Sequence, residues 1–342
     1  MISPGEGVTT TPVAVVRSDA LDDNLRLCIE RVVTERFGPY SAIIALDRRR
    51  WHEASSYPAE VLTARLASGE ELALFFKDFG SSAFQKVEPR LQRDRELRVY
   101  RDVLADAGLG TPEYFGSTWD ESRERYWLFL ELVVGTPLAY CGFDHWIAAV
   151  GWLARLHGHC AAHPRTMVRR DFLLTHDANF FWTTARRAMR AVSSISLLLA
   201  ERVDEILRRY ASCVDVMASQ RPTLVHGAFK PRHILVDAAS ARPRFCPVDW
   251  ELAAAGSNVY DLAFLAHGLK GEPLERLLEA YRREAIARDL PLSGREEMRY
   301  LVDCFRLHRV LKALSGAEER ALSEARVAKL VEIGEQLGQL VC

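Results

Sequence analysis

Apolar and polar positions alternate differently in the two parts of this 342-residue chain. Up to about residue 131, short apolar runs typical of strands are interrupted by two segments of helical periodicity. The turn at Gly69 joins two of these runs into a hairpin. The predicted elements are a helix at 21–36, strands at 42–46, 59–66 and 71–77, a helix at 87–107, and strands near Tyr114 and Trp127.

Beyond residue 131, long segments with apolar residues at helical spacing dominate. They cover residues 143–159, 185–219, 274–288, 296–314 and 317–340. We therefore predict an α+β protein with two lobes, a small antiparallel sheet with one key helix in residues 1–131 and a mostly helical lobe in residues 132–342.

The composition agrees with two lobes and argues against some classes of binding partner. At 342 residues, with 49% of them apolar and 27% charged, the chain exceeds the size at which single hydrophobic cores stop growing. A net charge of -1 argues against nucleic acid or an anionic membrane as the main partner. No apolar stretch approaches the roughly 20 residues that span a bilayer. The seven cysteines show no paired metal spacing, which favours reduced thiols in the cytoplasm.

The segment Leu-Val-His-Gly-Ala-Phe-Lys-Pro-Arg-His-Ile-Leu-Val-Asp at 224–237 has the length and framing of a kinase catalytic loop. Against the protein-kinase pattern His-Arg-Asp-Leu-Lys-Pro-Glu-Asn, residues 226–233 align without a gap. Ala228 stands where that pattern has its Asp base, and His233 stands where it has a metal-holding Asn. The loop therefore lacks two side chains that normally take part in the chemistry.

Three further residues occur in the order that kinases use. Lys77 ends a predicted strand, Glu96 lies on the following predicted helix, and Asp249 ends an apolar run 16 residues after His233. With Tyr100, the strand at 126–131, Gly135 and the helical segment at 152–157, they make the chain resemble the aminoglycoside phosphotransferase and choline kinase-like family, over residues 41–265.

This resemblance implies a protein kinase-like fold and a site for ATP or GTP with Mg²⁺ or Mn²⁺. Lys77 would grip the phosphates while Glu96 holds its ammonium group in place. Candidate nucleotide contacts also include Ser55 and Ser56, in a glycine-free loop expected at 48–58, and Glu131 and Val133 where the lobes join. An ordinary polar turn is the alternative for the two serines.

On the catalytic side, Asp249 is the expected metal ligand, because Mg²⁺ prefers carboxylate oxygen. His233 is a second candidate ligand and a candidate base, although imidazole suits Mn²⁺ better than Mg²⁺. Lys230 matches the lysine that stabilises the transferring phosphoryl group in protein kinases. His226 completes the candidate catalytic set, with a packed structural histidine as the alternative, and Asp261 is expected to brace the loop.

Two functions remain open. The first is an atypical phosphotransferase acting on a hydroxyl of a small metabolite, natural product or peptide. The second is a nucleotide-binding pseudokinase that regulates a protein partner, which Ala228 favours. Positioning and charge stabilisation carry most of a phosphoryl transfer, whereas a general base contributes about 10² to 10⁴-fold. The loss of the Asp therefore weakens a kinase without abolishing it, and no acidic patch or aromatic cage identifies the substrate.

Overall fold

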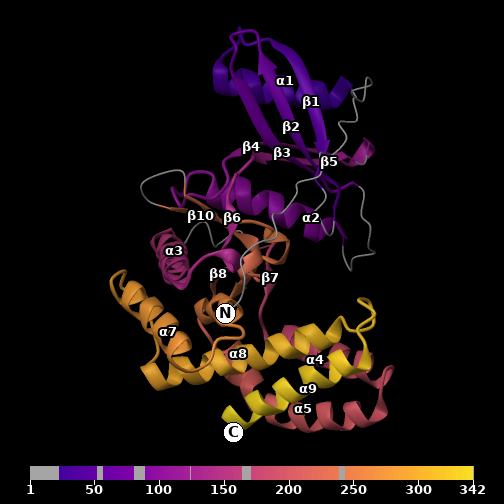
Figure 1. Cartoon of the computed structure of the whole chain (residues 1–342), viewed down its shortest axis with the longest axis vertical. Coiled ribbons are helices and arrows are strands. Elements are labelled where there is room, and N and C mark those ends of the chain that lie inside the picture. Colours follow the sequence, from indigo (N-terminus) through magenta and orange to yellow (C-terminus); the bar gives the residue numbers. More distant parts are fainter. Residues whose placement is uncertain are drawn as a thin grey trace, which may run out of the picture. The chain divides into compact units, whose positions relative to one another are not determined.

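The computed structural model of the protein describes residues 23–51, 57–80, 89–123, 125–163, 171–238 and 243–341. It divides into two compact units (Figure 1). The sheet unit comprises Met1–Val87 and Glu113–Leu132, and the helical unit comprises Glu88–Pro112 and Val133–Cys342. The predicted α+β class, a small antiparallel sheet followed by helices, is confirmed.

The sheet unit is one antiparallel sheet with a helix on one face. Its elements are α1 (Asp23–Phe37), β1 (Ile43–Arg50), β2 (Ala59–Leu66), β3 (Glu71–Asp78), β4 (Tyr114–Asp120), the 3₁₀ turn η2 (Glu121–Arg123) and β5 (Arg125–Glu131). The strand order is β1-β2-β3-β5-β4. Buried residues of α1 and of β2, β3 and β5 form a common hydrophobic core.

The alternation of β3 explains which way Lys77 points. Leu72, Leu74 and Phe76 belong to the core beneath α1. Because side chains alternate along a strand, Lys77 lies on the opposite face, where its register partners are Ala59 of β2 and Leu128 of β5. There it is only 8% exposed.

The first strand is longer than the sequence pattern indicated. Residues 48–50 were expected to begin a loop, but they continue β1 and pair with Glu60, Val61 and Leu62 of β2. Arg48 makes a two-pronged ion pair with Glu60, with an Nε–Oε2 distance of 2.7 Å. Cross-strand pairing and this ion pair therefore accommodate three arginines in a strand at the edge of the sheet.

The helical unit contains most of the chain. Its helices are α2 (Pro89–Arg98), the π-helix η1 (Val99–Leu104), α3 (Phe143–Ala162), α4 (Ala178–Ser193), α5 (Leu197–Ala218), α6 (Asn258–Leu265), α7 (Gly271–Ile286), α8 (Arg295–Ser315) and α9 (Glu324–Leu340), with 3₁₀ turns η3 (Leu138–Tyr140), η5 (Pro231–His233) and η6 (Trp250–Leu252). Its strands are β6 (Thr136–Pro137), β7 (Leu174–Thr175), β8 (Thr223–Val225), β9 (Ile234–Asp237), β10 (Arg244–Pro247) and β11 (Ala254–Gly256). They form two three-stranded sheets, β10-β9-β6 and β7-β11-β8.

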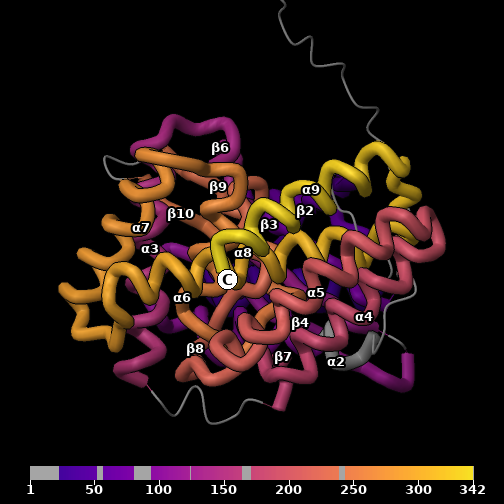
Figure 2. Tube along the Cα trace, turned by 90° about the horizontal axis from the view of Figure 1, so that it is seen from below, coloured from indigo at the N-terminus to yellow at the C-terminus, as the bar shows by residue number. Residues whose placement is uncertain are grey.

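Helix α8 is central to this unit. It packs against α4, α5, α6 and α9, and these helices gather around it in Figure 2. Most of its residues from Met298 to Leu314 are buried, including the polar Asp303, Arg306 and His308. Polar groups on α8 are thus held in a packed environment, where their charge state matters for stability.

Two predicted helices differ in extent from the sequence pattern. The segment 185–219 is two helices, α4 and α5, and the hydroxyls of Ser193 and Ser194 bond to carbonyl oxygens of α4 just where it ends. The segment 87–107 is α2 followed by one π-helical stretch. The sequence pattern placed this segment with the first lobe, whereas it groups with the helical unit.

A buried arginine explains that grouping. Arg95 is 3% exposed and donates to the carbonyl oxygens of Phe172 at 2.9 Å and Glu251 at 2.7 Å. Charge-assisted hydrogen bonds of this kind are the strong ones, and they tie α2 to the segment that follows Asp249. Among the described residues, no helix is long and apolar enough to cross a membrane.

Candidate functional site

The kinase-like loop lies between β8 and β9 of the helical unit, and a buried carboxylate holds it in place. Asp261 in the first turn of α6 accepts from the backbone N–H of His226 at 2.5 Å and of Gly227 at 3.0 Å. Burial raises the pKa of Asp261 to about 7, against the lowering effect of these two N–H groups. The expectation that Asp261 braces the loop is confirmed.

Gly227 is required by its surroundings. Its φ of +77° is in the left-handed region, and a Cβ atom there would lie 1.9 Å from the carbonyl oxygen of Leu252. That distance is far below any van der Waals contact. The loop therefore passes close to the backbone of η6, and only glycine permits this approach.

His226 is engaged at both ring nitrogens. Nε2 lies 3.0 Å from the carbonyl oxygen of Val248, so it carries the proton, and Nδ1 then accepts from the N–H of Ala228 at 3.3 Å. Burial lowers the pKa of His226 to about 3, so the ring is neutral. These contacts match the structural alternative for His226 and leave neither nitrogen for a proton from a substrate.

Asp249 and His233 lie together, as metal ligands would. Asp249 Oδ2 is 3.6 Å from Nδ1 of His233, an atom that is buried and has no hydrogen-bond partner among the described residues. Asp249 adopts a left-handed backbone conformation, φ 71° and ψ 61°. A non-glycine residue persists there only when its surroundings enforce it, which is common at functional sites.

Lys230 and Ala228 lie in the same loop. The N–H of Lys230 donates to the carbonyl oxygen of Ala228 at 2.7 Å, and the N–H of His233 donates to that of Lys230 at 2.8 Å. Burial, then Arg309 and Arg320, lower the pKa of Lys230, while Asp249 and Glu251 counteract them. Ala228 is 2% exposed, so a small methyl group occupies the position of the missing Asp.

Two basic residues of α8, which no sequence motif indicated, also lie beside the loop. Lys312 Nζ donates to the carbonyl oxygen of Gly227 at 3.3 Å. Lys312 Nζ and Arg309 Cζ both lie over the ring of Phe264, at 5.3 Å and 5.4 Å from its centroid. The spacing of 309 and 312 on one helical face is the signal that the sequence offered, and it points to no chemistry by itself.

The remaining predicted residues are distributed over both units. Lys77 belongs to the sheet unit, where its Nζ lies 5.7 Å from the ring centroid of Tyr57 and 5.2 Å from that of Phe79. Glu96 is a buried residue of the helical unit, 2% exposed. Burial, with the charges of Glu96 and Asp249 nearby, raises the pKa of Tyr100 well above its ordinary value. The pairing of Lys77 with Glu96 stays a prediction.

At the junction of the two units, Glu131 ends β5 and its carboxylate accepts from the backbone N–H of Glu113 at 3.1 Å. Val133 is the first residue of the helical unit after that junction. Ser55 and Ser56, proposed for the nucleotide-covering loop, lie outside the described residues. The roles of these four residues therefore stay predictions.

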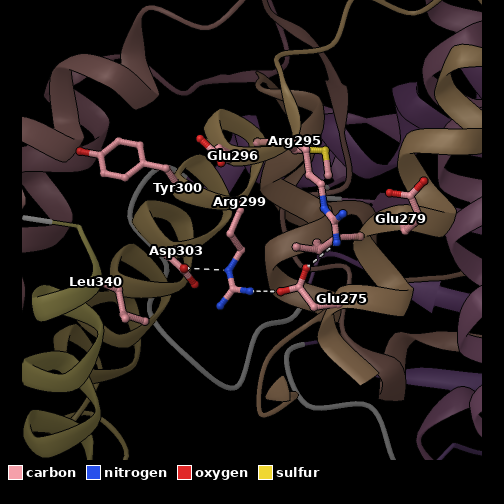
Figure 3. Close-up of a pocket in the computed structure, with 10 residues that line it drawn as sticks. Glu275, Glu279, Arg295, Glu296, Arg299, Tyr300, Asp303 and Leu340 are labelled. Atoms are coloured by element: carbon pink, nitrogen blue, oxygen red, sulfur yellow. Dashed lines mark hydrogen bonds and ion pairs between the residues drawn. The ribbon is translucent and has the colours of Figure 1, made fainter. Parts of the chain in front are cut away.

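A separate cavity of about 420 Å³ lies beside the N-terminal half of α8 (Figure 3). Arg299 points between Glu275 and Asp303 and bonds to both, and Arg295 lies 3.5 Å from Glu275. Its basic groups are thus already matched by acids of the same wall. None of the residues predicted from the loop motif lines this cavity.

The arrangement can be compared with known proteins. A family model described as the phosphotransferase enzyme family matches residues 62–301. No curated protein sequence is similar enough to the chain to count as a relative. Among solved structures, the GDP and kanamycin complex of an aminoglycoside phosphotransferase is 16% identical, with a TM-score of 0.62 over 92% of this chain and 99% of that one.

Two more solved structures share the fold. Choline kinase from Cryptosporidium parvum is 12% identical, with a TM-score of 0.60 over 92% of this chain and 96% of that one. The macrolide 2'-phosphotransferase MphH from Brachybacterium faecium is 18% identical, with a TM-score of 0.55 over 91% and 96%. The fold is therefore the kinase-like one, and the chain belongs to the phosphotransferase enzyme family.

Proposed function

We propose that this protein transfers the γ-phosphoryl group of ATP or GTP to a hydroxyl of a small metabolite, natural product or peptide. The observation that carries the proposal is the placement of Asp249 and His233 beside a loop that Asp261 holds in kinase-like form. Structurally similar enzymes are described as GDP complexes, which supports a nucleotide site and makes GTP a donor to test beside ATP.

The two candidate ligands fit a metal carried by the nucleotide. One carboxylate oxygen and one buried imidazole nitrogen without a hydrogen-bond partner among the described residues stand 3.6 Å apart. A bound divalent ion would neutralise charge on the phosphates. Because imidazole suits Mn²⁺ better than Mg²⁺, this donor pair supports a preference for Mn²⁺.

The reaction that we propose balances without a further reactant. The acceptor oxygen forms a bond to the γ-phosphorus, and the bond from that phosphorus to the bridging oxygen breaks. The electron pair leaves with the nucleoside diphosphate, and the hydroxyl proton passes to water. Lys230 offers positive charge to the moving phosphoryl group, while Ala228 offers no base, so we expect turnover to be slow.

A pseudokinase is the second candidate, and one observation favours it. Ala228 is buried, and its methyl group replaces the only carboxylate that the kinase pattern places against the acceptor. In that case nucleotide would bind and a protein partner would respond to it. A cytoplasmic location is part of both proposals, since the cysteines of the described residues are free thiols.

Nucleotide binding tests the proposal at its base. Titration calorimetry with ATP and GTP, each with Mg²⁺ or Mn²⁺, should show binding, and ligand at about 100-fold above its dissociation constant should stabilise the fold by about 2.7 kcal/mol. Lys77→Ala and Asp249→Asn should each remove most of this shift. If no nucleotide binds to the wild-type protein, a scaffold without nucleotide replaces both proposals.

Metal preference tests the placement of His233. We expect Mn²⁺ to support ADP release better than Mg²⁺, and we expect His233→Asn to reverse the order because an amide oxygen suits Mg²⁺. An unchanged preference in His233→Asn would show that His233 does not reach the metal.

A further inference from the structure

Four basic side chains have no ion pair with a carboxylate among the described residues: three lie in the catalytic loop or contact it or Phe264, and the fourth, Arg320, acts on Lys230 and Lys312 through its charge. The four are Lys230, Arg309, Lys312 and Arg320. The first three are partly buried and Arg320 is exposed. The whole chain has 45 basic and 46 acidic residues, so the local excess does not come from a basic composition.

The contacts of Lys312 and Arg309 place this basic cluster next to the loop. Lys312 Nζ holds the carbonyl oxygen of Gly227, the residue just before Ala228. Arg309 shares the ring of Phe264 with Lys312, and its Nε is buried without a hydrogen-bond partner among the described residues. A buried guanidinium N–H without an acceptor is costly, so a ligand that supplies an acceptor would be stabilising.

The basic groups also repel one another. Burial, then the charges of Lys230, Arg309 and Arg320, lower the pKa of Lys312 to about 7 against the opposing effect of Asp261. Burial lowers the pKa of Arg309 to about 10. This repulsion is what a bound anion would relieve.

The nearby acids already have partners. Asp261 accepts the two N–H groups that hold the loop, and Asp249 lies beside His233. Glu251 also raises the pKa of Lys230, but among the described residues none of these three carboxylates makes an ion pair with the cluster. The unmatched positive charge therefore remains for a group from outside the chain.

We propose that the basic cluster Lys230, Arg309, Lys312 and Arg320 binds an anionic group, a carboxylate or a phosphate, that is carried by the molecule whose hydroxyl is phosphorylated. This inference rests on the proposed function and names its class of acceptor. Lys312 touches the loop at Gly227, next to Ala228, whose counterpart in the kinase pattern meets the acceptor hydroxyl. Lys77 and Asp249 are assigned to the nucleotide, and Lys230 is shared between the moving phosphoryl group and the anionic acceptor. A polycationic acceptor such as kanamycin would meet repulsion from the cluster.

Binding rather than turnover gives the test, so that it does not depend on an active enzyme. The full-length protein is saturated with a non-hydrolysable ATP analogue and Mn²⁺, which fills the sites for nucleotide phosphates. Glycerol 3-phosphate, D-glycerate, citrate and inorganic phosphate are then titrated calorimetrically, with glycerol and kanamycin as neutral and cationic probes. If the analogue does not bind, the proposed function fails, and the same titrations without it still decide the anion site.

Variants assign the binding to the cluster. We expect at least one anion to bind to the wild-type protein, and we expect its affinity to fall at least tenfold in Arg309→Gln and in Lys312→Gln. Arg295→Gln, which removes a basic group of the separate cavity, is the matched control and should leave anion affinity unchanged. The affinity for the ATP analogue should stay within twofold in all three variants. Melting temperatures confirm that each variant is folded.

Three results would overturn the inference. The first is that none of the four anions binds, and the second is that kanamycin binds as tightly as any anion. The third is that Arg309→Gln and Lys312→Gln weaken the ATP analogue as much as the anion, which would assign the cluster to the nucleotide phosphates.

Discussion

The basic side chains in the two halves of helix α8 differ in whether they pair with a carboxylate. In the N-terminal half, Arg295 and Arg299 pair with Glu275 or Asp303, and Arg306 near the middle of the helix pairs with Asp303. In the C-terminal half, Arg309 and Lys312 meet no carboxylate among the described residues and instead lie over Phe264. The first half lines a cavity whose basic groups are already matched by acids (Figure 3), and the second half borders the catalytic loop.

The presence or absence of a carboxylate partner distinguishes basic groups that stabilise the fold from basic groups that are available to bind a ligand. Breaking a buried ion pair by removing one partner costs stability, whereas a buried charge that has no partner lowers the stability of the folded protein. Opposite signs of the stability change are therefore expected for mutations at Asp303 and Lys312, about two and a half turns apart on the same helix.

The largest expected effect comes from bringing a carboxylate to the unmatched region. Ala228→Asp restores the missing base, so we expect ADP release to rise by about 10² to 10⁴-fold. The same carboxylate would add negative charge next to Gly227, to which Lys312 donates, so the affinity for an anionic acceptor should fall. Steady-state kinetics at varied acceptor concentration separates the two effects. No gain, in a variant that folds and binds nucleotide, would point to a pocket kept for binding.

Breaking the matched half should cost stability. Asp303 is 4% exposed and bonds to Arg299 at 3.0 Å and Arg306 at 2.9 Å. Asp303→Ala leaves the buried Arg306 without its acid, and we expect a loss of about 3–5 kcal/mol in the free energy of unfolding. Urea denaturation measures this loss, and the exposed Glu297→Ala on the same helix should stay within about 0.5 kcal/mol. A small loss in Asp303→Ala would contradict the assigned role of the pairing.

Removing a charge from the unmatched half should have the opposite sign. We expect Lys312→Met to raise the free energy of unfolding by about 1–4 kcal/mol at pH 6, because a desolvated charge is replaced by an apolar side chain of similar length. The exposed Lys329→Met in α9 is the control and should change little. If Lys312→Met instead lost as much stability as Asp303→Ala, Lys312 would contribute to the stability of the fold rather than to a binding site.

The pH dependence of that gain has a definite sign. Burial lowers the pKa of Lys312 from 10.5 to about 7. Below about pH 7 the folded wild type carries the buried charge and its full cost. As pH rises from about 7 towards 10.5, the folded state loses the proton while the unfolded state keeps it, so wild-type stability rises. The advantage of Lys312→Met should therefore shrink between pH 6 and pH 9. The groups that face Lys312 are Lys230, Asp261, Arg309, Arg320, His176 and His308.

The smallest effect comes from converting the unmatched half into a matched one. A glutamate at position 313 lies four residues after Arg309 on one helical face. Ala313→Glu should add about 0.2 kcal/mol of stability, because a base that precedes the acid is the weaker order, and should weaken anion binding by about twofold relative to Ala313→Gln. Calorimetry and thermal melts of the two variants check this. Tighter anion binding in Ala313→Glu would argue against the cluster as an anion site.

Sequence patterns predicted the parts of the fold that local chemistry determines. The strand at Ala59–Leu66 has the predicted bounds, because a Gly-containing turn fixes its end and apolar residues fill it. Asp261, an acid that opens an apolar helix, was expected to brace the loop through backbone hydrogen bonds, and it accepts from the N–H groups of His226 and Gly227. The extension of β1 to Arg50 was missed, because pairing with β2 overrides the charge of three arginines.

The basic cluster could not be predicted from the sequence, for a different reason. Lys312 meets Gly227 across 85 residues of chain, and no motif links the two positions. Only the packing of α8 against α4, α5, α6 and α9 brings it to the loop. Its lack of an acidic partner is likewise a property of the folded chain, since the sequence carries almost equal numbers of acids and bases.

Transfer of the γ-phosphoryl group to an acceptor with a negative charge is the central claim, and isotope labelling tests it most directly. ATP and GTP labelled at the γ-phosphate are incubated with Mn²⁺, the wild-type protein and pools of hydroxyl compounds sorted into anionic, neutral and cationic sets. We predict that label enters a member of the anionic set, and that Asp249→Asn abolishes the transfer while Lys312→Gln weakens it. Label in the cationic set alone, or in no set while nucleotide binds, would contradict the account.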